Sequence, residues 1–465
     1  MTHAADDEYD VIVVGAGPGG EDCTTALLEA GLTVALVETE LVGGECFNWA
    51  CVPSKAMLRP AHALRSAARL PGAGEAITRP LDAGAALRHR DHIVLHHDDS
   101  SAVDEFTDAG AVFVRGHGRI DGRNRVVVTT GDVERLLRAR HAVVLATGST
   151  PALPDIPGLA AARPWTNREA TSASSAPDRL VVLGSGAVGL ELAQAWRSLG
   201  SSEVVVLSRR GALLPDHEPF VGELVLAGLR ESGVDVRFDA RLSRVERLAD
   251  GGVLLTLGDG STERADELLV AVGKNPATGD VGVETVGLTP GDYVAVGDDM
   301  RVEGTDWLYA IGDVNGRALL THQASYHARI AASSVATRAS GVDDDLVDEV
   351  NETAVPQVVF TDPEVASVGL TLERATARGI RARRVEADLG AVLGAELHAK
   401  GYRGRVSFTV DDDRGVLVGA TFVGQDVADM VHAATIAIVG RLTLRQLRHA
   451  VPSFPTMSEV WLELS

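Results

Sequence analysis

The chain has 465 residues, enough for two or three domains, and 45% of them are hydrophobic. Its formal charge of −22 argues against binding to nucleic acid or to an anionic membrane surface. The acidic start MTHAADDEYD does not resemble a secretion signal, and no apolar run approaches the roughly 20 residues needed to cross a bilayer. We therefore expect a cytoplasmic protein.

Residues 9–38 read as a short apolar strand, a glycine turn, a helix and a second apolar strand. Gly15, Gly17 and Gly20 form the pattern G-x-G-x-x-G between the first strand and the helix. These glycines permit a tight turn, let a phosphate approach the backbone and pack the helix on the strand. Glu38 closes the second strand at about the spacing at which an acidic residue reaches a ribose hydroxyl. The unit predicts a dinucleotide site.

Two cysteines, Cys46 and Cys51, follow this unit in the stretch GGECFNWACVPSK, and the chain has only one other cysteine. That number excludes a four-thiolate zinc site and a disulfide-stapled secreted scaffold. Residues five apart on a regular helix lie roughly 8–9 Å apart at Cα, whereas a disulfide tolerates only about 4.4–6.8 Å. A bridge therefore requires an irregular turn, which Pro53, Gly43 and Gly44 favour. Two unpaired buried cysteines are the alternative.

The strand–glycine–helix pattern recurs over residues 179–210. Its glycines are Gly184, Gly186 and Gly189. Ser208 stands where the first unit has its acid, and Arg209 and Arg210 follow it. A carboxylate would repel a 2′-phosphate, whereas guanidinium groups bind it bidentately, so we predict NADPH over NADH at this unit. Two dinucleotide units in one chain suggest electron transfer between two dinucleotides.

With the cysteine motif placed just after the first unit, the chain resembles the pyridine nucleotide–disulfide oxidoreductases almost end to end. This family includes dihydrolipoamide dehydrogenase, glutathione reductase and mercuric reductase. Further motifs that carry the resemblance are LATGSTP (145–151), AVGKNP (271–276), LYAIGDV (308–314), FTDPEVASVGLT (360–371) and FPTMSE (454–459).

The resemblance implies an α/β fold with two Rossmann-like dinucleotide-binding domains and a C-terminal α+β dimerisation domain. The FAD domain would be split between residues 1–150 and 275–345, with the NAD(P) domain, residues 151–274, inserted. Residues 346–465 would form the dimerisation domain, and the active site would be shared between the two subunits of a homodimer.

The same resemblance assigns cofactor contacts. Asp313, expected on the strand of LYAIGDV, looks like the ribitol-binding aspartate, and a helix beginning near Thr321–His322 would point its positive end at the flavin. Residues assigned to FAD are Gly15, Gly17, Gly20, Glu38, Gly44, Lys55, Gly118, Thr147, Gly148, Asp313 and His322. Residues assigned to the nicotinamide nucleotide are Gly184, Gly186, Gly189, Arg209, Arg210 and Gly273.

By resemblance, Cys51 faces the flavin as the charge-transfer thiolate and Cys46 is the interchange thiol that attacks the acceptor. The family pairs a lysine at the position of Lys55 with a glutamate that matches Glu191, beside flavin N5. Lysine occurs only at positions 55, 274 and 400, against forty arginines, so a lysine here suggests that a compact ammonium is needed.

The chain departs from the family at FPTMSE, where disulfide reductases carry HPTxSE. Phe454 holds the place of the histidine that, paired with a glutamate, moves the proton of the interchange thiol, and Glu459 remains without this partner. Because general acid–base catalysis contributes roughly 10²–10⁴ in rate, we predict slow turnover of lipoamide and glutathione disulfide. His432 and His449 are other histidines nearby in sequence.

We expect the protein to pass electrons to a small-molecule acceptor and to contain no metal site. Three functions remain open. The first is a disulfide reductase whose acceptor does not need the missing base. The second is an NADPH-dependent reductase of quinones, dyes or metal ions by direct flavin transfer. Mercuric reductases share an aromatic near position 454, but they end in an extra cysteine pair, which this sequence does not show. The third is a flavin redox sensor without turnover, against which the intact cysteine pair, Lys55 and Glu191 count.

Overall fold

The computed structural model describes residues 7–341, 346–350 and 353–464. Its contacts divide the chain into two units, which are described separately below. The first contains Met1–Pro53, Asp91–Pro151 and Lys274–Asn351, and the second contains Ser54–Arg90, Ala152–Gly273 and Glu352–Ser465. This division does not test the predicted boundaries of three domains, which stay a prediction.

The first unit is built on a seven-stranded sheet in the order β3-β2-β1-β6-β5-β4, with β16 also paired to β6. Strands β1, β2, β3, β6 and β16 pair in parallel, whereas β4 and β5 pair antiparallel. The bounds are β1 (Asp7–Val14), β2 (Val34–Glu38), β3 (Val112–Arg115), β4 (His117–Ile120), β5 (Arg125–Thr130), β6 (Val133–Leu145) and β16 (Leu308–Ala310). A separate pair joins β7 (Ser149–Pro151) and β15 (Lys274–Pro276).

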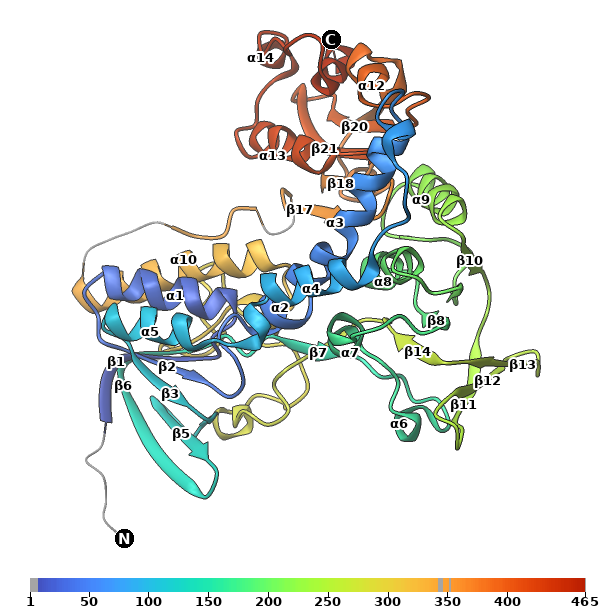
Figure 1. The fold of residues 1–465 in the computed structure, drawn as a ribbon. Coiled ribbons are helices and arrows are strands. Elements are labelled where there is room, and N and C mark those ends of the chain that lie inside the picture. The colour runs from blue at the N-terminus through green and yellow to red at the C-terminus, as the bar shows by residue number, and fades with distance from the viewer. Residues whose placement is uncertain (1–6, 342–345, 351–352, 465) are drawn as a thin grey trace. The chain divides into compact units, whose positions relative to one another are not determined.

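Helices α1 (Pro18–Glu29) and α10 (Thr321–Ser340) lie side by side in this unit (Figure 1). They approach closely because Gly19 of α1 has no side chain, and a Cβ there would lie 3.2 Å from Cβ of Ala324. The central strands are apolar on both faces, as expected of a parallel sheet covered by helices. The unit also contains α2 (Gly44–Trp49) and α5 (Ser100–Asp108).

The second unit contains a parallel sheet in the order β10-β9-β8-β14 and an antiparallel sheet in the order β11-β12-β13. Their bounds are β8 (Arg179–Leu183), β9 (Glu203–Leu207), β10 (Val234–Arg237), β14 (Glu267–Val270), β11 (Leu242–Arg247), β12 (Val253–Leu257) and β13 (Thr262–Ala265). The associated helices are α6 (Leu159–Ala162), α7 (Asn167–Ser172), α8 (Ala187–Ser198) and α9 (Pro219–Glu231).

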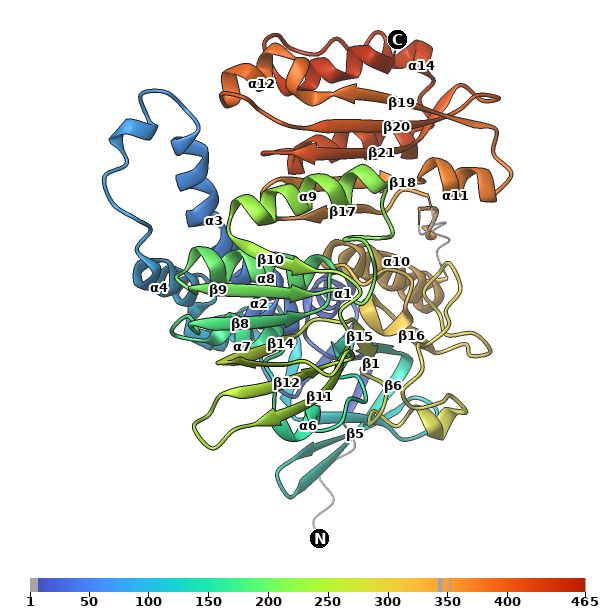
Figure 2. The same ribbon diagram turned by 90° about the vertical axis from the view of Figure 1, so that its right-hand side faces the viewer.

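The C-terminal part of the second unit is an antiparallel sheet in the order β17-β18-β21-β20-β19 (Figure 2). Its strands are β17 (Pro356–Val359), β18 (Glu364–Gly369), β19 (Ala382–Asp388), β20 (Arg405–Asp411) and β21 (Val416–Gly424). Its helices are α11 (Leu372–Ala377), α12 (Leu393–His398), α13 (Val431–Val439) and α14 (Leu444–Leu447).

Two helices, α3 (Cys51–Ala68) and α4 (Ala83–Ile93), run from residues of one unit into residues of the other. The mixed seven-stranded sheet and the parallel four-stranded sheet, each with a glycine turn from a parallel strand into a helix, confirm the predicted α/β fold class. Among the described residues, no helix combines the length and the apolar character that a membrane span requires.

Candidate active site

The first glycine turn connects β1 to α1 and requires glycine at two of its positions. Gly15 has φ of +104°, and a Cβ there would lie 2.4 Å from the carbonyl oxygen of Ala146. A Cβ on Gly20 would lie 1.9 Å from the carbonyl oxygen of Gly15. Gly17 caps α1 with extended backbone, and no side chain caps the helix. The first N–H groups of α1 therefore remain for an anionic ligand.

Further predicted residues border this turn. A Cβ on Gly44 would lie 2.8 Å from Cα of Gly17, so the start of α2 packs directly on the glycine turn. Thr147 lies beside Gly15, and its hydroxyl is buried and makes no hydrogen bond within the described structure. Gly148 follows with φ of +73°. The glycine turn has no room for side chains, and the buried Thr147 hydroxyl lacks a hydrogen-bond partner in the described structure. Both features fit a bound dinucleotide.

Glu38 ends β2 as predicted and is 8% exposed. Its carboxylate accepts hydrogen bonds from the backbone N–H groups of Ala16, at 2.7 Å, and Glu40, at 2.7 Å. Burial raises the pKa of Glu38, and these two N–H groups oppose the rise. Gly118 lies on β4, where a Cβ would approach Val14 and Val37 near the ends of β1 and β2.

Asp313 lies in the 3₁₀ turn η4 (Gly312–Asn315), so the prediction that it sits on the strand was wrong by a few residues, because β16 ends at Ala310. Its carboxylate Oδ2 accepts hydrogen bonds from Ser149 Oγ at 2.5 Å and from Lys274 Nζ at 2.9 Å. Burial disfavours the charge of Lys274, but Asp313, Cys51 and Glu45 outweigh it and raise the pKa of the ammonium. These two hydrogen bonds fix the position of the carboxylate.

The cysteine pair lies on two helices that are separated by one irregular residue. Helix α2 ends at Trp49, Ala50 has φ of −129° and ψ of −94°, and α3 begins at Cys51. The predicted irregular turn is confirmed. Pro53 lies within the first turn of α3, where its missing N–H is tolerated, so the break precedes the proline. Neither cysteine is in a disulfide in this structure.

The hydroxyl of Thr321 contacts the sulfurs of both cysteines, although 275 residues separate Thr321 from Cys46. It donates to Cys46 Sγ at 2.9 Å, and its Oγ1 lies 3.5 Å from Cys51 Sγ. A hydrogen bond to Cys51 raises the pKa of Cys46 most, burial raises it further, and the Thr321 hydroxyl lowers it. The first two effects favour the protonated form of the Cys46 thiol. Thr321 opens α10, whose positive end also favours an anion there.

Removal of the Thr321 hydroxyl is expected to slow alkylation of Cys46. In reduced protein, Thr321→Val removes the hydroxyl that donates a hydrogen bond to Cys46. The pKa of Cys46 therefore rises, and less of its thiolate is present at any pH below that pKa. Because a hydrogen bond to a charged group contributes about 1.5–3 kcal/mol, alkylation at pH 8 should slow by about tenfold or more. Peptide mass spectrometry measures Cys46 separately, Thr321→Ser is the control, and an unchanged rate in Thr321→Val would contradict the expectation.

The predicted partner of Lys55 is confirmed within the second unit. Lys55 Nζ lies 2.7 Å from Glu191 Oε2, and the Glu191 carboxylate is buried, with its other oxygen accepting from Phe360 N at 2.8 Å. The ammonium also lies 5.0 Å from the centre of the Phe360 ring. Lys55 follows Cys51 by one turn of α3.

The second glycine turn repeats the geometry of the first. Gly184 has φ of +125°, and a Cβ there would lie 2.2 Å from the carbonyl oxygen of Ala271. A Cβ on Gly189 would lie 2.6 Å from the Gly184 carbonyl oxygen, and Gly186 caps α8. Gly273 has φ of +138°, and a Cβ there would meet only open space. The turn again leaves helix N–H groups for an anion.

The residues after β9 carry the predicted basic pair. Ser208 is fully buried, with Oγ 2.9 Å from Ser185 Oγ and 2.8 Å from the carbonyl oxygen of Arg210. The side chains of Arg209 and Arg210 are exposed, and neither forms an ion pair with another residue of the described part. Both guanidinium groups are available to a ligand.

The C-terminal segment carries the predicted Glu459 and the unexpected Phe454. Phe454 is 71% exposed. Glu459 Oε1 accepts from Thr456 N at 3.1 Å and from Gly394 N at 3.4 Å. His322, in the first turn of α10, is exposed. No group of three or more potential metal ligands occurs among the described residues.

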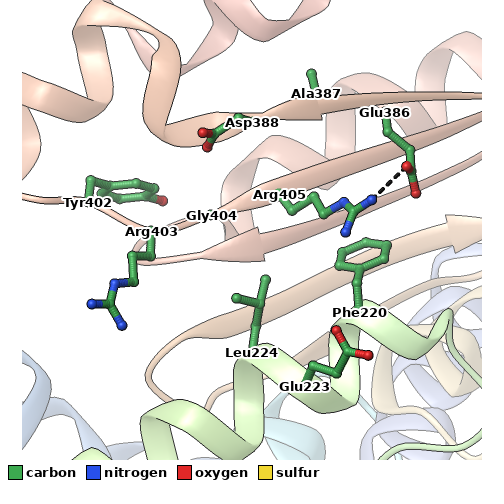
Figure 3. Close-up of a pocket in the computed structure, with 10 residues that line it drawn as sticks. All are labelled: Phe220, Glu223, Leu224, Glu386, Ala387, Asp388, Tyr402, Arg403, Gly404 and Arg405. Atoms are coloured by element: carbon green, nitrogen blue, oxygen red, sulfur yellow. Dashed lines mark hydrogen bonds and ion pairs between the residues drawn. The ribbon is translucent and has the colours of Figure 1, made fainter.

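A groove of about 510 Å³ in the second unit lies between α9 and the strands β19 and β20 (Figure 3). Arg405 crosses it, ion-paired with Glu386 at 2.6 Å and 5.0 Å from the ring centre of Phe220. None of the predicted site residues lines this groove.

Comparisons with known proteins agree with the fold. Residues 9–328 match the family model for pyridine nucleotide-disulphide oxidoreductase, and residues 355–465 match that for the dimerisation domain of this family. Mercuric reductase from Shigella flexneri is 34% identical over 97% of this chain and 79% of its own length. Dihydrolipoyl dehydrogenase from Haloferax volcanii is 30% identical over 98% of this chain and 95% of its own.

Two solved structures share the fold. The HOCl-induced flavoprotein disulfide reductase RclA from Escherichia coli, as a Cu(II) complex, matches with a TM-score of 0.85 at 22% identity over 98% of this chain and 99% of that one. LpdA from Mycobacterium tuberculosis matches with a TM-score of 0.83 at 25% identity over the same shares, 98% and 99%.

The chain belongs to the pyridine nucleotide–disulfide oxidoreductase family, as the sequence motifs predicted. Members of this family bind FAD and use NAD(P)H, and the chain is an FAD-dependent oxidoreductase of this type that carries the dimerisation domain.

Three side chains at this site were not predicted from the sequence. Thr321 entered it only as the start of a helix, although its hydroxyl contacts both cysteines. Ser149 lies in the motif LATGSTP and Lys274 in AVGKNP, and neither was assigned a role. The scarcity of lysine could have drawn attention to Lys274 as it did to Lys55.

Proposed function

We propose that this protein takes electrons from NADPH and passes them through FAD to the Cys46–Cys51 pair and then to a disulfide-type acceptor. The observation that carries the proposal is the convergence of both thiols on the Thr321 hydroxyl at the start of α10. Two isolated structural cysteines would need neither a shared hydrogen-bond donor nor a neighbouring ammonium.

The proposed FAD contacts come from the first glycine turn, Gly44, Thr147 and Asp313. The close approach of Gly44 to Gly17, the unsatisfied Thr147 hydroxyl and the fixed Asp313 carboxylate support this assignment. Gly15, Gly20, Glu38, Lys55, Gly118, Gly148 and His322 complete the proposed FAD set. Bound FAD would supply the two-electron chemistry that links the nicotinamide to the cysteine pair.

The two cysteines have different proposed roles. Cys51 carries the thiolate, which the ammonium of Lys274 stabilises, and Cys46 keeps the proton and acts as the interchange thiol toward the acceptor. The hydrogen bond from Cys46 to Cys51 and the effect of Cys51 on the pKa of Lys274 support this order. In the second unit, Glu191 orients Lys55 by accepting from its ammonium.

The nicotinamide nucleotide would bind at Gly184, Gly186, Gly189 and Gly273, with Arg209 and Arg210 on the 2′-phosphate. The absence of a carboxylate at position 208 and the unpaired state of both arginines within the described structure support NADPH.

Replacement of both arginines tests this preference. Arg209→Ala/Arg210→Ala should lower kcat/KM for NADPH by about ten- to hundredfold, since charged hydrogen bonds contribute about 1.5–3 kcal/mol, and leave NADH nearly unchanged. Arg244→Ala, an exposed arginine on β11, is the matched control. A wild-type protein that uses NADH as well as NADPH would contradict the prediction.

The split FAD domain, the inserted NAD(P) domain and the dimer with a shared active site remain proposals, as does a cytoplasmic location. The dimerisation domain supports the homodimer. Small disulfides are the proposed acceptors, and nucleic acid and membrane are not expected partners.

A second candidate function is direct reduction of quinones, dyes or metal ions by the flavin. Phe454 favours it, because a direct transfer needs no base for the interchange thiol. The similarity to a mercuric reductase keeps Hg²⁺ among the candidate acceptors. A redox sensor without turnover is the third candidate.

NADPH oxidation by the purified flavoprotein with disulfides, quinones and Hg²⁺ separates these functions. Disulfide reduction that is lost in Cys46→Ala supports thiol chemistry, whereas activity retained in that variant supports direct flavin transfer. A protein that oxidises NADPH with none of the acceptors, a quinone included, would contradict both enzyme functions.

A further inference from the structure

A strained turn at residues 95–97 lies close to α2 in the first unit. Leu95, His96 and His97 have φ values of 51°, 53° and 60°, a left-handed conformation that costs non-glycine residues free energy. Hydrogen bonds from His97 N to Val94 O at 2.9 Å and from Asp98 N to Leu95 O at 3.0 Å close the turn. Three such residues in a row persist only where surrounding contacts hold them.

Two contacts join this turn to α2, one before the helix and one at its end. Asp99 Oδ2 accepts from Val42 N at 2.8 Å, and the same oxygen lies 2.6 Å from Nη2 of Arg115. The ring of His97 stacks on that of Trp49, with centroids 5.7 Å apart and planes 21° apart. The segment Leu95–Asp99 thus contacts the chain on both sides of Cys46.

The contact between His97 and Trp49 lies at the end of α2, next to the irregular residue between the two cysteine-bearing helices. Trp49 is the last residue of α2, and the irregular Ala50 that follows turns the chain so that Cys51 comes back beside Cys46. The amide of Asn48 also ties this end to Val42 O at 3.1 Å. A ring fixed at Trp49 limits how the break at Ala50 can move.

We propose that Trp49 and His97 are positioning residues that set the redox equilibrium of the Cys46–Cys51 pair. The proposal rests on the proposed function. Formation of the bridge removes two electrons and two protons from the thiols, and both sulfurs must move together. The stack is present here with neither cysteine in a disulfide, and we expect it to restrain the movement of the chain at Ala50 that closing the bridge requires. Its loss should favour the disulfide.

The experiment equilibrates the holoprotein in glutathione buffers, where two glutathione thiols reduce the bridge and leave as glutathione disulfide. Alkylation and mass spectrometry then give the ratio of disulfide to dithiol. His97→Ala should raise this ratio by about two- to tenfold, the contribution typical of an aromatic pair. Trp49→Leu should have the same effect, and Trp49→Phe, which retains a stacked ring, should largely restore the wild-type ratio.

His96→Ala is the matched control, because it also places alanine at a positive φ but removes an exposed side chain. It should leave the ratio at the wild-type value, and the flavin-to-protein ratio of each variant reports whether it folds. Equal ratios in His97→Ala and His96→Ala would overturn the proposal. If wild-type protein instead shows no reducible bridge in any buffer, the proposed function fails, whatever the variants do.

Discussion

Replacement of Cys51 by serine is expected to abolish the long-wavelength absorbance that NADPH or dithionite produces in the anaerobic wild-type protein. The band arises from a thiolate that donates charge to the flavin, and we propose that Cys51 carries this thiolate, because the charge of Cys51 is among the causes that raise the pKa of Lys274. Serine at position 51 ionises far too weakly to replace it.

Cys46→Ser is the paired control for this experiment. It removes the interchange thiol but leaves Cys51, so the band should be retained, while disulfide reduction is lost. A band that survives in Cys51→Ser and disappears in Cys46→Ser would reverse the roles of the two cysteines. A band that survives in both variants would show that neither thiolate faces the flavin.

Phe454→His is expected to raise turnover of lipoamide or glutathione disulfide by at least about tenfold, from a slow wild-type rate. General acid–base catalysis contributes roughly 10²–10⁴, and phenylalanine cannot transfer a proton. Phe454 is 71% exposed, so histidine fits there without repacking a core. The Glu459 carboxylate accepts from two backbone N–H groups, so part of the gain depends on its release toward the new imidazole.

Phe454→Gln is the control, since it is polar but moves no proton at neutral pH. Steady-state rates with each disulfide, measured across pH 6 to 9, should show a new pH dependence in the histidine variant only. Wild-type turnover of either disulfide at hundreds per second would contradict the account of position 454.

The sequence predicted those parts of the site in which local spacing determines geometry. The spacing of Gly15 and Gly20 predicted the turn between β1 and α1, where a side chain on either would overlap the backbone. The five-residue spacing of Cys46 and Cys51 predicted an irregular turn, but not that the break falls at Ala50, ahead of Pro53.

Contacts between distant segments were not predictable in this way. Thr321 reaches the thiols because α1 and α10 pack side by side, an arrangement that no local pattern encodes. His97 joins the site through a left-handed turn of residues that rarely adopt one. The pairing of Lys55 with Glu191 was predicted only because the family resemblance supplied it.

Titration of accessible sulfhydryls before and after anaerobic reduction with NADPH shows whether Cys46 and Cys51 form a redox-active pair. We expect two additional sulfhydryls per bound flavin after reduction, located by mass spectrometry at positions 46 and 51. Unchanged thiol content on reduction, or new thiols in a protein without flavin, would contradict this expectation.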